Sequence, residues 1–156
     1  MIRAAVFADT HTNTARMLEA VRTLRPDVLI HLGDHDRDAE ALRRTFPELP
    51  LHVVRGNCDI LGNTPERLVV ELGPVKAFCT HGHLYSVDWS FDYLVYAAQE
   101  AGAKLALCGH THEAANLEIG GVQALNPGTA GKGRTLSCGL VTVFDNGGIA
   151  CEIRPL

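Results

Sequence analysis

Five short motifs place metal-binding side chains directly after apolar segments of the chain. They are Asp9-Thr10-His11, Gly33-Asp34, Gly56-Asn57-Cys58-Asp59, His81-Gly82-His83 and Gly109-His110-Thr111-His112. On an extended backbone, side chains two positions apart share a face, so Asp9 and His11 can converge on one cation, and His110 and His112 repeat that spacing. Carboxylates, an amide and imidazoles together favour Mn, Fe, Zn, Ni or Co over calcium. The pattern therefore predicts a site for divalent transition metals.

Each motif taken alone also has an interpretation without function. Asp9 and His11 suit a loop or a cap, Asp34 suits a helix N-cap, and the Asn57 motif suits a turn. A single histidine at a strand end is more often structural than a ligand, but two His-x-His pairs at strand ends are hard to explain by packing. The combination favours a pair of cations about 3.5–4 Å apart, which is a known device for phosphoryl displacement.

The elements that would position these motifs alternate between strand-like and helical patterns. Polar ligands at the carboxyl ends of strands are typical of open α/β sheets. The second half is richer in strands and ends with a hairpin signal at Asn146-Gly147. With no repeat or linker, we expect one α/β domain over residues 1–156. The expected strands are 2–8, 28–32, 51–55, 68–72, 75–80, 105–108, 122–125 and 140–144, and the expected helices are 13–24, 38–46 and 88–101, the last with Asp88 as its N-cap.

Composition and charge indicate which partners and which cellular setting to expect. The formal net charge is -4 over 156 residues, without a basic run, so a long nucleic acid is not an expected partner. No signal peptide and no apolar stretch of about 18 residues is visible, so no membrane association is expected. Five scattered cysteines without CxxC spacing indicate a reducing, cytoplasmic setting.

The order of the five motifs, followed by Asn126-Pro127-Gly128-Thr129, resembles the calcineurin-like metallophosphoesterase superfamily. Within it, the chain looks most like the small YfcE-type phosphodiesterases. The resemblance implies an α/β fold in which a two-sheet β-sandwich is flanked by helices, with the metals at the carboxyl ends of strands. It also implies that the Asn126 motif forms a structural loop beneath the site.

Carried over motif by motif, the resemblance implies a ligand for every position around two divalent transition metal ions, with Mn the first choice and Ni, Zn, Fe or Co the others. Asp34 bridges the two ions. The implied reaction is in-line attack of a metal-bridging hydroxide on a small phosphodiester, with Asn57 and His83 as catalytic residues and Asp59 orienting the loop that carries Asn57. One ion is held by Asp9, His11 and His112, and the other by Asn57, His81 and His110.

Three positions depart from the family pattern, and three alternatives stay open. Thr12 replaces a usual glycine, Cys58 stands where larger relatives have a histidine proposed as general acid, and Asp88 stands where many close relatives carry a lysine. A phosphomonoesterase or nucleotidase is one alternative to the phosphodiesterase. A non-catalytic protein-binding scaffold, as in the retromer coat, is another, although the complete ligand set favours the enzyme. A homo-oligomer is left open, because the aromatic cluster of residues 89, 91, 93 and 96 is expected to face either the core or a dimer contact.

Overall fold

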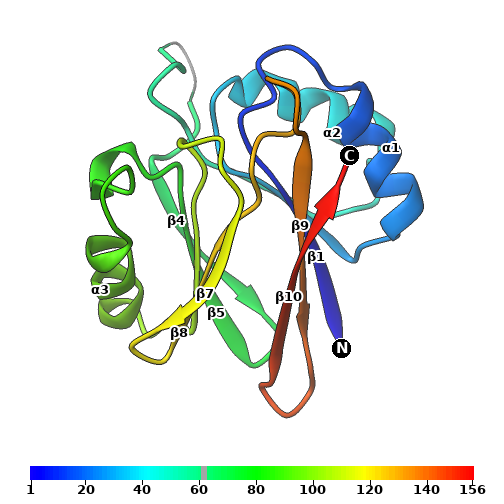
Figure 1. The fold of residues 1–156 in the computed structure, drawn as a ribbon. Coiled ribbons are helices and arrows are strands. Elements are labelled where there is room, and N and C mark those ends of the chain that lie inside the picture. Colours follow the sequence, from blue (N-terminus) through cyan, green and yellow to red (C-terminus); the bar gives the residue numbers. More distant parts are fainter. Residues whose placement is uncertain (61–62) are drawn as a thin grey trace.

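The computed structural model describes residues 1–60 and 63–156, and its elements follow the alternation expected from the sequence (Figure 1). Helices and strands alternate through the first half, and strands dominate the second. The elements are β1 (Ile2–Phe7), α1 (Ala15–Leu24), β2 (Val28–His31), the 3-10 turn η1 (Asp36–Asp38), α2 (Ala39–Thr45), β3 (Leu51–Val53), β4 (Arg67–Leu72), β5 (Val75–Thr80), the 3-10 turn η2 (His83–Tyr85), α3 (Asp92–Glu100), β6 (Leu105–Leu107), β7 (Ala115–Ile119), β8 (Val122–Asn126), β9 (Ser137–Val143) and β10 (Ile149–Pro155).

The strands form two five-stranded mixed sheets. The first has the order β10-β9-β1-β2-β3. In it β1, β2 and β3 are parallel, and β9 is antiparallel to both of its neighbours, β1 and β10. The second has the order β4-β5-β6-β8-β7, in which β5, β6 and β8 are parallel and the two edge strands are antiparallel. The expected two-sheet sandwich is therefore confirmed.

Three apolar clusters explain why the layers stack as helix, sheet, sheet and helix. The largest lies between the sheets and joins side chains such as Val6 and Leu107 from opposite layers. A second packs α1 and α2 onto the first sheet, with Met17 and Leu42 fully buried. The third packs Leu94 of α3 onto the second sheet (Figure 1). Burial of these apolar faces is the main favourable contribution to folding.

The start of the third helix differs from the expectation. We expected it to begin with Asp88 as its N-cap, but α3 begins at Asp92 with Phe91 in the capping position. Residues before it form a turn in which the Trp89 amide donates to the Ser86 carbonyl at 3.0 Å. The side chain of Asp88 is engaged elsewhere, in the contact described below, and so does not cap the helix.

Two further expectations fail at the surface. The strand Ala115–Ile119 was not expected, because it is a half-exposed edge strand without an apolar run. A core position is also wrong for three of the four aromatic residues, since Trp89, Tyr93 and Tyr96 are 90%, 63% and 59% exposed, whereas Phe91 is partly buried against the third apolar cluster. Periodicity shows which residues share a face but not whether another layer covers that face.

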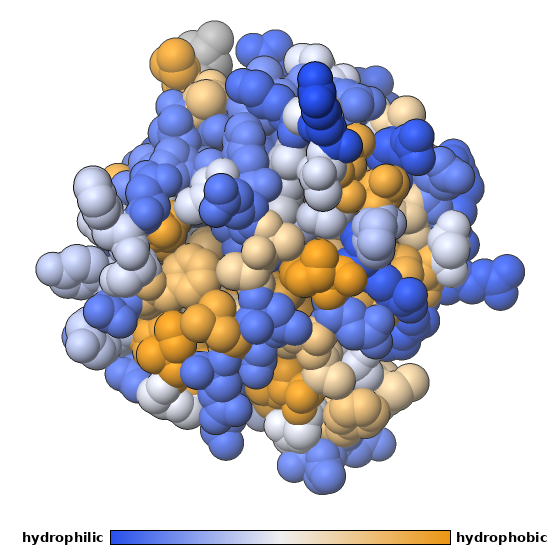
Figure 2. Space-filling model, viewed as in Figure 1, coloured by the Kyte–Doolittle hydropathy of each residue, from blue (hydrophilic) through white to orange (hydrophobic). Residues whose placement is uncertain are grey.

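The strand ends that carry the five motifs lie at one end of the sandwich. The surface there is mostly hydrophilic, whereas apolar side chains gather on the face over β7, β8 and β10 (Figures 1 and 2). In the part of the chain that the structure describes, no helix combines the length and the apolar character needed to span a bilayer.

Candidate metal centre

Loops from both sheets carry the predicted ligands to one place. Four predicted ligands follow β1, β2 and β3 of the first sheet, and three follow β5 and β6 of the second. Five of the seven have the left-handed backbone that non-glycine residues rarely adopt. These five, with their φ angles, are Asp9 (56°), His11 (46°), Asp34 (52°), His110 (73°) and His112 (63°).

The physical reason given for the Asp-x-His spacing, an extended backbone, is wrong, because Asp9 and His11 both have left-handed backbone. An extended segment was expected to bring Asp9 and His11 together, but both residues lie in a tight turn after β1. Each such conformation costs about 1–3 kcal/mol and persists only where the surroundings enforce it. The site is therefore held against its local backbone preference.

Glycines allow the loops to approach closely. A Cβ added to Gly56 would lie 2.2 Å from Asp34 Oδ1, and one added to Gly109 would lie 2.9 Å from Asp9 Oδ2. Gly33, whose φ is 94°, meets Gly56 so closely that a Cβ there would lie 2.5 Å from the Gly56 nitrogen. The glycines within the motifs thus make room for the carboxylates beside them.

The first group of ligand atoms is compact. His112 Nε2 lies 3.4 Å from Asp9 Oδ1 and 3.4 Å from His11 Nε2. His11 Nε2 lies 3.8 Å from Asp34 Oδ2. One donor atom from each of the four residues falls within 4.8 Å of the others, which is the arrangement a metal ion requires.

The second group shares Asp34 with the first. Asp34 Oδ1 lies 3.4 Å from His81 Nε2, while Oδ2 faces His11 of the first group. The ring of His81 lies 5.2 Å from that of His110, whose Nδ1 is 3.0 Å from Asn57 Oδ1. The two carboxylate oxygens of Asp34 therefore face different groups, as a bridging ligand would.

Unpaired buried atoms show that a divalent cation fits this place. Among the described residues, Asp9 Oδ1, His81 Nε2 and His83 Nδ1 are buried polar atoms without a hydrogen-bond partner. The Nδ1 of His81 lies 2.7 Å from the Leu32 carbonyl, so Nδ1 carries the proton and Nε2 presents a lone pair to Asp9 and Asp34. Buried polar groups are almost always paired, and a cation bound by Asp9 and His81 would satisfy two of these three atoms.

The electrostatics of the protein alone also favour a cation. Burial raises the pKa of Asp9 to about 6, against the attraction of His81 and His112. Burial also opposes ionisation of Asp34, but the adjacent His81 ring and the hydrogen bond from the Cys58 amide outweigh it and hold the pKa of Asp34 below its ordinary value. Burial lowers the pKa of His11, which keeps that imidazole neutral and able to ligate.

The residues expected to assist catalysis lie around these two groups. Asp59 accepts hydrogen bonds from the amides of His35 at 2.8 Å, Asp36 at 3.1 Å and Gly56 at 2.9 Å. It therefore joins the loops that carry Asp34 and Asn57. The ring of His83 lies 5.5 Å from that of His81, at the edge of the second group.

Residues beneath the site hold the ligand loops in place. Asn126 Nδ2 donates to the Gly109 carbonyl at 2.9 Å, and Thr129 Oγ1 donates to the Asp9 carbonyl at 2.9 Å. His31 is fully buried, accepts from the Gly33 amide at 3.2 Å and contacts Thr10 Oγ1 at 3.0 Å. Burial lowers the pKa of His31 to about 4, so it is a neutral structural histidine.

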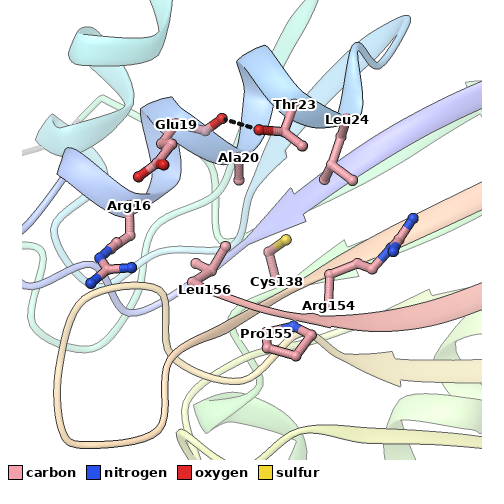
Figure 3. Close-up of a pocket in the computed structure, with 9 residues that line it drawn as sticks. All are labelled: Arg16, Glu19, Ala20, Thr23, Leu24, Cys138, Arg154, Pro155 and Leu156. Carbon is pink, nitrogen blue, oxygen red and sulfur yellow. Dashed lines mark hydrogen bonds between the residues drawn. The ribbon is translucent and has the colours of Figure 1, made fainter.

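Two clefts adjoin the ligand groups. One, of about 400 Å³, is lined by Thr12, His35 and Cys58 beside the first group and Asn57. The other, of about 310 Å³, is lined by Asp88 and Thr111 beside His110. A third pocket of about 240 Å³ lies apart, between α1 and β10, with Cys138 between these elements, and none of the predicted ligands lines it (Figure 3).

One residue at the site was missed by sequence reasoning. Asp88 Oδ2 lies 3.0 Å from His110 Nε2, although we noted Asp88 only as a departure from the family pattern and as a helix cap. No spacing signal links two residues that are 22 positions apart on different loops. The contact arises because the turn before α3 lies beside the loop after β6.

Comparison with known proteins agrees with this geometry. The model of the calcineurin-like phosphoesterase superfamily domain matches residues 2–146. The probable metallophosphoesterase YsnB of Bacillus subtilis is 36% identical over 104 residues, which cover 66% of this chain and 59% of that relative. A probable metallophosphoesterase of Mycoplasma genitalium is 32% identical over 133 residues, which cover 83% of this chain and 77% of the relative.

Solved structures share the fold along the whole chain. A conserved uncharacterized protein of Streptococcus pneumoniae, described as a predicted phosphoesterase, has a TM-score of 0.77 at 27% identity, covering 99% of this chain and 98% of that one. The Vps29 of Entamoeba histolytica complexed with Zn²⁺ has a TM-score of 0.78 at 22% identity, covering 99% of each chain. The match to the family model over most of the sequence, together with the Mycoplasma relative, shows that this chain belongs to the calcineurin-like phosphoesterase superfamily.

Proposed function

We propose that the chain is a phosphodiesterase that hydrolyses small phosphodiesters with two divalent transition metal ions, Mn²⁺ foremost. The observation that carries the proposal is the pair of ligand groups that share Asp34 and enclose the unpaired buried atoms of Asp9 and His81. Asp9, His11 and His112 would hold one ion, and Asn57, His81 and His110 the other. Two such ions activate water for attack on phosphorus and neutralise the charge that develops on the phosphate.

Other residues of the chain fix the ligand loops and would orient the substrate. Asp59 fixes the loop of Asn57 relative to that of Asp34 through three amide hydrogen bonds. His83, whose ring lies 5.5 Å from that of His81 and 6.3 Å from that of His110, would donate a hydrogen bond to a phosphate oxygen. Preorganised donors of this kind stabilise charge without reorganisation during the reaction.

A diester is favoured over a monoester by the surroundings of the metal centre. A phosphodiester has two ester groups, and two clefts are lined by residues that neighbour the ligands in the sequence, one by Thr12 and Cys58 and the other by Thr111. A phosphomonoester would use only one of these clefts. Acidic side chains outnumber basic ones in both clefts, with Asp36, Asp38 and Asp59 against Arg37 in one and Asp88 and Glu113 in the other, and would accommodate its second negative charge less well.

A scaffold is the second candidate, because Vps29 structures share this fold. One of these structures is described as a complex with Zn²⁺, so metal binding alone does not distinguish an enzyme from such a protein. Turnover does. The ligand set around both groups is complete here, which supports the enzyme.

The deciding experiment is a substrate panel assayed with the metal-loaded protein. A bis-aryl phosphate, an aryl phosphomonoester and a cyclic nucleotide are each assayed with Mn²⁺, Ni²⁺, Zn²⁺ and Mg²⁺. We expect the highest kcat/KM on the diester with Mn²⁺, and its loss in Asp34→Asn but not in the control Asp92→Asn on the exposed start of α3. A monoester preference would support a phosphomonoesterase. No turnover by fully loaded protein would support the scaffold.

A further inference from the structure

The two ring nitrogens of His110 have different partners. Nδ1 lies 3.0 Å from Asn57 Oδ1, inside the second ligand group. Nε2 lies 3.0 Å from Asp88 Oδ2, outside it. His110 is therefore the link between the proposed second cation site and a carboxylate that no motif of the sequence assigns to that site.

The carboxylate decides which nitrogen of His110 is free to bind a cation. An ionised Asp88 only accepts hydrogen bonds, so it takes the proton on Nε2. A neutral imidazole that carries its proton on Nε2 presents its lone pair at Nδ1. That lone pair then faces Asn57 Oδ1 at 3.0 Å, and a cation bound by both atoms would make these two acceptors favourable together.

The other histidine of the second group is oriented differently. His81 is fixed by the main-chain carbonyl of Leu32, 2.7 Å from its Nδ1, and binds through Nε2. His110 is instead oriented by the side chain of Asp88. The orientation of His110 can thus be altered by one substitution, whereas that of His81 cannot.

The backbone that carries Asp88 is well fixed although its side chain is exposed. Val87 beside it is buried in the cluster under α3 and packs onto Gly82, where an added Cβ would lie 2.7 Å from a Val87 methyl. The turn is closed by the amides of Trp89 and Ser90, which both donate to the Ser86 carbonyl, at 3.0 and 3.3 Å. The side chain of Asp88 is 57% exposed, so its effect on His110 is that of a partly hydrated carboxylate rather than a buried one.

We propose that Asp88 is a positioning residue that holds His110 in the tautomer and orientation that bind the second cation through Nδ1. The inference rests on the proposed function, since it requires the second ligand group to hold a metal ion. Partners that orient metal-binding histidines in this way typically change metal affinity by about 10–100-fold. Because Asp88 is partly hydrated, we expect about a 10-fold effect.

The test is a titration of metal-free protein with Zn²⁺, followed by calorimetry, for the wild type and three variants. His110→Ala identifies the binding event of the second site. Asp88→Ala is expected to weaken that event by about 10-fold and leave the other unchanged. Asp92→Asn, which removes an exposed carboxylate at the start of α3 that has no contact with His110, is expected to behave as wild type.

A second readout follows the ring of His110 itself. In ¹⁵N correlation spectra of the Zn²⁺-loaded wild type, we expect a metal-bound Nδ1 and a protonated, hydrogen-bonded Nε2. In Asp88→Ala, the hydrogen-bonded Nε2 signal should be lost. Unchanged spectra, unchanged second-site affinity, or equal weakening of both sites in Asp88→Ala would overturn the role of Asp88. Wild-type protein that binds fewer than two ions would instead overturn the proposed function.

Discussion

The Nε2 atoms of His11 and His112 lie 3.4 Å apart, with their rings inclined by 62°. The two residues are 101 positions apart and belong to loops of different sheets. Asp9 Oδ1 lies 4.0 Å from the nitrogen of His11 and 3.4 Å from that of His112, and it has no hydrogen-bond partner among the described residues. Lone pairs that face each other in this way are stabilised by a positive ion at their centre.

The first prediction therefore concerns metal stoichiometry. We expect two divalent ions per chain, and lower occupancy of both in Asp34→Asn, because the two oxygens of Asp34 face different ligand groups. Elemental analysis of protein reloaded with Mn²⁺ and passed through a desalting column measures this. One ion per chain, unaffected by the substitution, would contradict the dinuclear site.

A second prediction separates the two histidines of the Gly109 motif. His112→Ala should deplete the ion held with His11, and His110→Ala the ion held with Asn57, because these residues lie in different groups. We expect each variant to lose about 100-fold or more in kcat/KM. Residues that only orient a metal ligand change activity by up to about 100-fold, and loss of the ligand itself should cost at least as much. Both should unfold cooperatively, since both side chains lie outside the apolar clusters. If thermal unfolding of both variants loses its cooperativity, the motif is structural.

The third prediction concerns the pH dependence of stability in metal-free protein. The pKa of Asp9 is raised from 3.8 to about 6, so the folded state keeps a proton that the unfolded state has lost. The contribution of Asp9 to stability is therefore fully present below pH 3.8 and is lost as the pH rises to about 6. At pH 7 the ionised Asp9 therefore destabilises the metal-free folded state relative to its stability at pH 3.8.

Asp9→Asn carries no such charge and tests this directly. We expect metal-free Asp9→Asn to be more stable than metal-free wild type at pH 7 and to lose that advantage at pH 4. Urea unfolding at both pH values measures the difference. Saturating Mn²⁺ should reverse the order at pH 7, because only the wild type retains all ligands of the first ion. An advantage of the same size at both pH values would show that the ionisation of Asp9 is not its cause.

Cys58 gives the fourth prediction. Its amide donates to Asp34 Oδ1 at 2.9 Å, while its thiol is exposed, and burial and the nearby Asp34 raise the pKa of that thiol. The backbone of Cys58 thus holds the Asp34 carboxylate, and its thiol accepts a hydrogen bond from Asn57 Nδ2 at 3.7 Å that a serine hydroxyl can also accept. Cys58→Ser should leave aryl diester hydrolysis nearly unchanged.

Substitutions of Cys58 should also show whether the site lacks a general acid that protonates the leaving oxygen. General acid catalysis is typically worth about 10²–10⁴-fold, and mainly for poor leaving groups. We expect wild type to prefer aryl over alkyl esters strongly, and Cys58→His to gain on alkyl esters. Turnover plotted against the pKa of the leaving group compares the three proteins. A collapse of activity in Cys58→Ser on every ester, with full metal content, would make the thiol catalytic.

Apolar periodicity predicted most of the strands but missed β7 and gave no bounds for β10, and the order of the motifs predicted the layers and the residues that gather at the strand ends. It did not predict how Asp9 and His11 meet. Their convergence depends on left-handed backbone, which is imposed by long-range contacts such as that of Thr129 with the Asp9 carbonyl. The role of Asp88 was missed for a similar reason, since only the docking of the turn before α3 brings it to His110.

The division of the ligands between the two sheets has a consequence for the kinetics of folding. Asp9, His11, Asp34 and Asn57 belong to the first sheet, and His81, His110 and His112 to the second, so neither sheet alone completes either ligand group. A metal ion can therefore bind tightly only after the sheets have docked, and it then acts as a cross-link between them. An interaction that forms after the transition state slows unfolding without accelerating folding. Metal ions should thus lengthen the lifetime of the folded chain while leaving its refolding rate unchanged.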